Sequence, residues 1–359
     1  MNELFQPTRF GDLELRNRVV MAPMTRSRAD EQALPTAEMV EYYAQRASAG
    51  LIIAEGTAPS MHGLGYCRTP GIYSPEQISA WRRVTDAVHS GGGRIVLQLM
   101  HCGRVACAEN KPAGARTVAP SAIAAQTELF TDSAGLVPTL TPDALTADEI
   151  GAVIEDYRQA ALNARAAGFD GVELHATSGY LPMQFMAENS NQRTDAYGGS
   201  LENRVRFPLE VLKAMSEAIG AGRVGLRVCP GNPYNDVRDS DPLATLQALL
   251  AGINGMGLAY LHVMRAQVPD LDAFAIARAG FSGALLINDG FDFASAHQAL
   301  TDGAAQAVSF ARHFIANPDL VERFRHGLPL ARFDRKTLYS AGAAGYCDYP
   351  VHQTVEEGV

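Results

Sequence analysis

The sequence predicts a (β/α)8 TIM barrel, an α/β fold in which eight parallel strands alternate with helices. Short apolar runs alternate with longer stretches of helical period, which is the pattern of parallel strands joined by crossover helices. Several runs are apolar at consecutive positions, as at Leu51, Ile52 and Ile53, and this is typical of strands covered on both faces. The chain has 359 residues, which fits one barrel of about 250 residues with long loops. We therefore expect residues 1–359 to form a single domain.

Each element of the barrel can be placed along the chain. A helix is expected over 146–167, because Thr146 followed by Glu149 forms a capping box. Residues 1–16 alternate weakly around Gly11, and we expect a hairpin that closes the lower end of the barrel. The segment 102–142 is too long for an ordinary loop and follows the third strand, so we expect a lid over the active face. The eight expected strands are 17–25, 51–57, 94–101, 171–177, 223–230, 259–265, 283–290 and 305–312.

Composition and charge exclude several classes of protein. The net charge is -9 and no basic block occurs, which argues against a nucleic-acid partner. The chain has neither an apolar run of about 18 residues nor a basic, then apolar, leader at its N-terminus. We expect a cytoplasmic protein without a membrane segment. The five cysteines are scattered without a CxxC pair, so neither a disulfide framework nor a metal site is indicated.

Polar residues gather at the expected strand ends, which meet at one face of a barrel where catalytic groups are found. Tyr180 lies five residues beyond His175, and a phenol of pKa near 10 is a suitable proton donor to a forming enolate. Strands seven and eight end at positions where barrels commonly bind phosphate, with Arg312 as the cation. The strand-end residues in question are Thr25, Glu55, Thr57, Gln98, His101, His175, Arg227, Asn288, Asp289, Gly290, Ala311 and Arg312.

Taken singly, each of these residues has a structural interpretation as well. Arg312 could pair with a neighbouring carboxylate, and His175 could be a core histidine bonded to backbone. Tyr180 could be a packing residue beside a turn, while Thr25 and Gln98 could be ordinary buried polar groups. Only their convergence at one face of the barrel favours a functional site.

Six motifs resemble the old yellow enzyme family, in the right order and over nearly the whole chain. The segment from Asn191 to Arg204 is the most specific of them. The motifs are MAPMTR (21–26), SAGLIIAEGT (48–57), LHATSGYLPMQF (174–185), NQRTDAYGGSLENR (191–204), ANPDL (316–320) and GYCDYP (345–350).

The resemblance implies a barrel that binds FMN and passes hydride from NADPH or NADH to an activated alkene. It implies that Pro23, Met24, Thr25 and Gly56 line the flavin edge. Gln98 and Arg227 would hold the pyrimidine end of the ring, where a fixed arginine stabilises the anionic reduced flavin. The phosphate would be bound by Asp289, Gly290, Ala311 and Arg312, although relatives often have an uncharged residue in place of Asp289.

For the substrate, the resemblance implies that His175 and Ser178 bind its carbonyl or nitro oxygen beside the flavin and that Tyr180 donates the proton. Tyr66 and Tyr339 would lie over the flavin. Two departures bear on substrate range: Ser178 stands where relatives have His or Asn, and Met100 where many have Trp. The serine hydroxyl is shorter and neutral, and the flexible thioether of methionine predicts a roomier site.

The main hypothesis is an FMN-dependent ene-reductase acting on α,β-unsaturated carbonyl or nitro compounds, as a monomer or homodimer. A second hypothesis keeps the flavin but gives a desaturase, an oxidase or a nitroester reductase. A third is a flavin-free barrel for phosphate ligands. The third is disfavoured, because a Schiff-base enzyme needs a lysine at a strand end and Lys111, Lys213 and Lys336 lie elsewhere.

Overall fold

Eight parallel strands close into a barrel in the structure, a computed structural model that describes residues 2–352. This confirms the predicted fold. The order around the barrel is β10-β11-β12-β13-β14-β3-β4-β5, so each strand pairs with the next barrel strand along the chain, and the last, β14, pairs with the first, β3. The barrel strands are β3 (Val19–Met21), β4 (Leu51–Thr57), β5 (Ile95–Leu99), β10 (Gly171–Ala176), β11 (Val224–Val228), β12 (Tyr260–Met264), β13 (Leu285–Asn288) and β14 (Ala307–Phe310).

Several strands end earlier than predicted. β3 stops four residues before Thr25, because Pro23 has no N–H to donate and the chain leaves the ladder after Ala22 bonds to Phe310. His101 and Arg312 likewise lie two residues beyond β5 and β14. Thr25 and His101 therefore belong to loops above the barrel, and Arg312 begins helix α9 (Arg312–Ala316).

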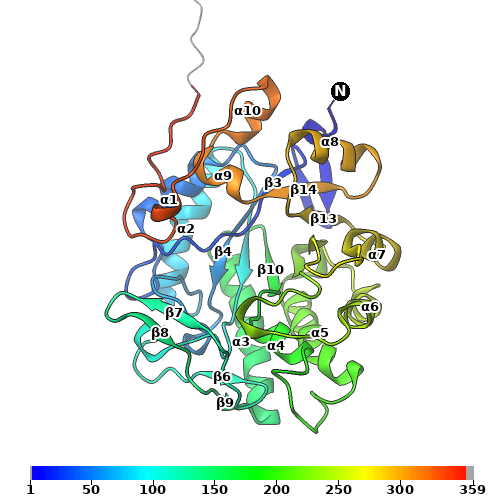
Figure 1. Ribbon diagram of the computed structural model, residues 1–359. Coiled ribbons are helices and arrows are strands. Elements are labelled where there is room, and N and C mark those ends of the chain that lie inside the picture. The colour runs from blue at the N-terminus through cyan, green and yellow to red at the C-terminus, as the bar shows by residue number, and fades with distance from the viewer. Residues whose placement is uncertain (1, 353–359) are drawn as a thin grey trace, which may run out of the picture.

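Helices surround the barrel and bury most of the core between themselves and the strands (Figure 1). The capping box predicted at Thr146 and Glu149 begins α3, and Ser74 with Gln77 begins α2 in the same way. The helices are α1 (Ala37–Gln45), α2 (Pro75–Ser90), α3 (Ala147–Ala166), α4 (Leu181–Met186), α5 (Leu201–Ile219), α6 (Pro242–Ile253), α7 (Ala273–Gly280), α8 (Phe293–Thr301), α9 (Arg312–Ala316) and α10 (Leu320–His326). Within residues 2–352, none of them is both long and apolar enough to cross a membrane.

A hairpin covers the amino-terminal end of the barrel, as predicted. β1 (Thr8–Phe10) and β2 (Leu13–Leu15) pair antiparallel, and Phe10 packs on Tyr260 with ring centroids 5.2 Å apart. Gly11 adopts φ 53°, and a Cβ there would lie 2.5 Å from the carbonyl oxygen of Gly222. The turn therefore requires glycine, both for its conformation and for its close approach to the barrel.

The insertion after β5 folds into two small sheets, which Figure 1 shows beside the barrel. β6 (Val118–Ala119) pairs with β9 (Asp143–Ala144), and β7 (Glu128–Thr131) with β8 (Gly135–Pro138). On the β7–β8 hairpin, Leu129 is buried, whereas Phe130 and Leu136 are exposed. This alternation turns one face of the hairpin toward the barrel.

Candidate active site

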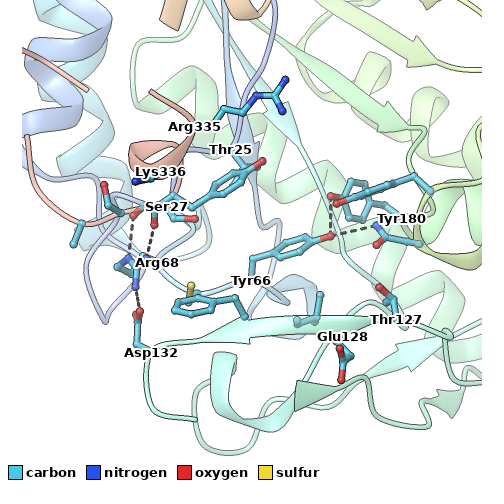
Figure 2. A pocket seen from close by; sticks show the side chains of 18 residues that line it. Thr25, Ser27, Tyr66, Arg68, Thr127, Glu128, Asp132, Tyr180, Arg335 and Lys336 are labelled. Carbon is cyan, nitrogen blue, oxygen red and sulfur yellow. Dashed lines mark hydrogen bonds and ion pairs between the residues drawn. The ribbon is translucent and has the colours of Figure 1, made fainter. Parts of the chain in front are cut away.

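A cavity of about 700 Å³ opens above the carboxyl ends of the strands. Its walls come from the loops after β3, β4, β10 and β11, from the β7–β8 hairpin and from the C-terminal segment (Figure 2). Among the residues predicted from sequence, Thr25, Tyr66, Tyr180 and Tyr339 line it. The other lining residues are Ser27, Cys67, Arg68, Thr127, Glu128, Leu129, Phe130, Asp132, Tyr234, Asn235, Arg335, Lys336, Ser340 and Ala341.

Tyr66 and Tyr180 turn their hydroxyls toward each other in this cavity (Figure 2). The Tyr180 hydroxyl donates to that of Tyr66 at 3.2 Å, and the Asn235 amide also donates to Tyr66 at 3.2 Å. Burial raises the pKa of Tyr180 well above its usual value, and the neighbouring Tyr66 raises it further. Tyr180 is therefore protonated at neutral pH and can act as a proton donor.

His175 contacts Tyr180 edge to face, with ring centroids 4.8 Å apart, although it does not itself line the described cavity. Burial lowers the pKa of His175 well below its usual value, and the charge of Arg227 adds to this effect. The ring is therefore neutral. Its buried Nδ1 has no hydrogen-bond partner within residues 2–352, which leaves that atom to a ligand.

Ser178 is placed less directly. It adopts φ 59°, and its hydroxyl lies 3.5 Å from that of Thr177. Its carbonyl oxygen accepts a 2.8 Å hydrogen bond from Asn235. Like His175, Ser178 is not among the residues that line the cavity, and its part in binding the substrate oxygen stays a prediction.

Met100 lies directly against Gly56. A Cβ on Gly56 would be 2.6 Å from the sulfur of Met100, so no larger residue fits at 56 without displacing the thioether. Met100 also belongs to a small apolar cluster with Tyr180, Tyr66 and Leu129. This cluster joins the insertion to the floor of the cavity.

Arg227 is buried inside the mouth of the barrel. Its Nη2 donates to Asn288 at 3.1 Å and its Nη1 to the carbonyl oxygen of Pro23 at 3.5 Å. Its buried Nε has no partner within the described chain. Gln98 lies nearby in β5 and donates through Nε2 to Glu173 at 2.8 Å. Met24, next to Pro23, is partly buried against the core.

A second cleft of about 290 Å³ lies between the ends of β13 and β14. It brings together Asp289, Gly290, Ala311 and Arg312, as predicted from their positions. Asp289 and Gly290 adopt φ 82° and 77°, a turn that exposes backbone to the cleft. Arg312 is exposed and forms no salt bridge within residues 2–352, so the alternative of a carboxylate partner finds no support there.

Known proteins similar to this chain identify its family. Residues 3–331 match the model of the NADH:flavin oxidoreductase / NADH oxidase family. A probable flavin mononucleotide-dependent alkene reductase of Leishmania infantum is 44% identical, covering 97% of each chain. The chain belongs to the old yellow enzyme family. 12-oxophytodienoate reductase 1 of Oryza sativa subsp. japonica is 40% identical, over 99% of this chain and 94% of that protein. A solved structure of morphinone reductase in complex with tetrahydroNAD has a TM-score of 0.95 at 46% identity, over 99% of each chain.

The residues present fit the FMN of old yellow enzymes. Nε of Arg227 and Nδ1 of His175 are buried polar atoms without a hydrogen-bond partner in the described residues. Because an unsatisfied buried polar group costs free energy, and a charged one costs more, both atoms call for a ligand. The cleft at Arg312 offers a cation and a turn of backbone for a phosphate.

The C-terminal segment of this old yellow enzyme is held to the loop after β3. Arg28 donates to the carbonyl oxygens of Thr337, Leu338, Gly342 and Ala344, and Figure 1 shows the segment beside α1. The neighbouring Arg26 donates to those of Leu338 and Gly345. These contacts hold Arg335, Lys336 and Tyr339 at the cavity.

Fourteen of the lining residues were not predicted from the sequence, among them Asn235, Arg335 and Lys336. Asn235 could have been found, because it follows the fifth strand and so had to lie at the same face as Tyr180. Arg335 and Lys336 follow no strand, and nothing in their spacing signals their position.

Proposed function

We propose that this protein is an FMN-dependent ene-reductase that uses NAD(P)H to reduce the activated C=C bond of α,β-unsaturated carbonyl or nitro compounds. The observation that carries the proposal is the pairing of a protonated Tyr180 with Tyr66 in the cavity beside a neutral His175. The names of its relatives, an alkene reductase and a 12-oxophytodienoate reductase, support the same chemistry.

Cofactor binding would divide between the mouth of the barrel and the cleft at Arg312. Pro23, Met24, Thr25 and Gly56 would line the flavin edge, while Gln98, Arg227 and His175 would face its polar atoms. Asp289, Gly290 and Ala311 would bind the phosphate through backbone, and Arg312 would supply the charge. Bound FMN, once reduced by NAD(P)H, supplies the hydride that adds to the β carbon of the alkene.

The protein's own part in the second half-reaction is to orient the substrate and to deliver a proton. His175 binds the carbonyl or nitro oxygen, with Ser178 or a water as the second contact, and so draws electron density from the alkene. Tyr180 gives its proton to the α carbon. Tyr66, whose hydroxyl accepts from Asn235, then donates its own proton to the phenolate and regains one from solvent in the cavity.

The hydride donor occupies the same cavity before the substrate. Arg335 and Lys336 are exposed at its outer wall and form no salt bridge within residues 2–352. We assign them to the phosphates of the dinucleotide, which favours NADPH because its 2′-phosphate adds charge there. Residues 1–359 act as one FMN-binding barrel domain, cytoplasmic and without a nucleic-acid partner, as a monomer or homodimer.

The visible spectrum tests the function most directly. Purified protein should be yellow, should bleach when NADPH is added without oxygen, and should regain its colour on addition of cyclohexenone. Recovery with a nitroester but not with cyclohexenone would point to nitroester reduction. A colourless protein that binds phosphate ligands would favour the flavin-free alternative.

A further inference from the structure

A continuous chain of buried polar side chains runs through the interior of the barrel from Glu173 to Arg227. Glu173 Oε2 lies 2.9 Å from Nδ1 of His262, and Nε2 of His262 lies 2.8 Å from the hydroxyl of Ser309. Asn288 donates to that hydroxyl at 2.8 Å and accepts from Arg227 at 3.1 Å. None of the five side chains is more than 7% exposed.

The strand register explains why residues so distant in sequence meet. Asn288 of β13 pairs with Ser309 of β14, and Arg227 of β11 pairs with His262 of β12. The chain therefore crosses five neighbouring strands of the barrel and ends at Arg227.

Each hydrogen bond in this chain can run in only one direction. The Glu173 carboxylate accepts, so Nδ1 of His262 carries the proton and Nε2 accepts from the Ser309 hydroxyl. Because the Asn288 amide nitrogen donates both to the hydroxyl and to the backbone carbonyl oxygen of Ser309, at 2.8 and 2.9 Å, the amide oxygen of Asn288 is left facing Arg227. Burial lowers the pKa of His262, which agrees with a neutral ring.

A second arm starts from the same carboxylate. Gln98 donates its amide nitrogen to Oε1 of Glu173 at 2.8 Å. The orientation of the amide is thereby set, and its oxygen remains to accept a hydrogen bond from a ligand. One carboxylate thus fixes the amide of Gln98 and begins the chain that reaches Arg227, whose guanidinium can only donate.

We propose that Glu173 is a positioning residue which, through these two arms, presents Gln98 as an acceptor and Arg227 as a donor to the pyrimidine edge of FMN. The inference rests on the proposed function. The pyrimidine edge of a flavin carries one N–H donor between carbonyl acceptors, so it requires both kinds of partner. By orienting Arg227, the chain favours the anionic reduced cofactor over the oxidised one.

The barrel would not need this chain for stability alone. A buried carboxylate and a buried guanidinium are costly, and apolar residues of similar size are often at least as stabilising. Glu173 and Arg227 form no salt bridge with each other and are linked only through neutral side chains. Such an arrangement suits orientation more than ion pairing.

Two variants of holoenzyme test the proposal. Ser309→Ala breaks the chain of hydrogen bonds without changing any charge. Glu173→Gln removes the carboxylate from which both arms begin. We expect Ser309→Ala to lower the affinity for reduced relative to oxidised FMN about tenfold, which corresponds to a two-electron midpoint potential about 30 mV more negative. Glu173→Gln should weaken binding of oxidised FMN about tenfold, because the Gln98 amide is free to turn. Dissociation constants by fluorescence titration and potentials by dye equilibration measure both.

The controls separate positioning from stability. Thr85→Ala removes a hydroxyl that is equally buried but belongs to α2. It should change neither the affinity for FMN nor the midpoint potential. Ser309→Thr keeps the hydroxyl and should restore the potential. If Ser309→Ala and Glu173→Gln lower the melting temperature but keep wild-type FMN affinities and potential, the proposal is wrong. If Glu173→Gln does not fold, the midpoint potentials of Ser309→Ala and Ser309→Thr decide whether the proposal holds. Wild-type protein that binds FMN but reduces no enone would refute the proposed activity and leave this comparison valid.

Discussion

The hydroxyl of Tyr180 donates a 3.2 Å hydrogen bond to the hydroxyl of Tyr66, a residue 114 positions earlier in the chain. Tyr66 also accepts from Asn235, so its own proton is free to point into the cavity. A proton lost from Tyr180 can therefore be replaced through Tyr66 without any movement of the backbone.

Replacing Tyr180 by Phe should slow alkene reduction by about two to four orders of magnitude, because the proton donor is lost. Flavin reduction by NADPH should survive, since that half-reaction needs no proton from Tyr180. Stopped-flow absorbance separates the two half-reactions. Equal loss in both would refute the role of Tyr180 as the acid.

Replacing Tyr66 by Phe should have a smaller effect on the same half-reaction, about tenfold, because Tyr180 loses the acceptor that orients it and the donor that reprotonates it. Single-turnover reoxidation by cyclohexenone measures this. Tyr157→Phe is the matched control: its buried hydroxyl in α3 has no hydrogen-bond partner within the described residues, so its loss should not alter the rate. A Tyr66→Phe enzyme with the wild-type rate would exclude the relay.

Replacing Arg312 by Ala should weaken FMN binding about tenfold, because an exposed charge-assisted contact with the phosphate is removed. Riboflavin, which lacks the phosphate, should bind wild type and variant equally. Asp289→Asn should strengthen FMN binding slightly by removing a like charge from the cleft. Titration of apoprotein with both flavins gives the comparison, and equal losses for both would show that Arg312 acts elsewhere.

Glu55 should make stability depend on pH. Burial raises its pKa from 4.5 to about 7, although hydrogen bonds from Arg26 and Tyr43 partly oppose this. Between these values the folded state holds more protons than the unfolded state, so the free energy of unfolding falls as pH rises from 4.5 to 7. The loss is about 3 kcal/mol.

Urea unfolding of wild type and Glu55→Gln at intervals from pH 5 to 8 tests this prediction. In the variant, the free energy of unfolding should not fall over this pH range as it does in wild type. The variant should therefore gain stability relative to wild type as pH rises. The same change at Glu14, which is exposed on β2, should leave the slope as it is. Parallel curves for wild type and Glu55→Gln would contradict the assignment.

Replacing Arg335 and Lys336 together by Ala should raise the KM for NADPH more than that for NADH, because the lost charges face the extra phosphate. The rate of flavin reduction at saturating donor should not change. Steady-state kinetics with both donors measure the ratio. An unchanged ratio would place the dinucleotide phosphates elsewhere in the cavity.

The sequence predicted the fold well because parallel strands have a strong local signal. Continuous apolar runs such as Leu51 to Ala54 identified all eight barrel strands, and the Thr146 capping box placed the start of α3. Strand ends were harder to predict, since they depend on the last inter-strand hydrogen bond and not on the residue itself. Pro23 carried that information for β3, but nothing marked the ends of β5 and β14.

The site was predictable where chemistry coincides with a strand end, as for Tyr180 and Arg312. It was not predictable where two distant segments meet. Glu173 lies 89 positions from His262, and both look like ordinary strand residues until the register brings them together. Ser178 shows a further limit, because nothing in its motif indicated the left-handed backbone that it adopts.

Arg26 and Arg28 hold the C-terminal segment by its carbonyl oxygens, by the Ser340 hydroxyl and by cation–π contacts of both guanidinium groups with the Tyr346 ring. Anchorage of this kind does not depend on which residues occupy positions 335, 336 and 339. The side chains at the cavity entrance can therefore vary, in nature or in a directed library, while the backbone of the C-terminal segment keeps its conformation. Cofactor preference and substrate size would then evolve at the rim without any redesign of the barrel beneath it.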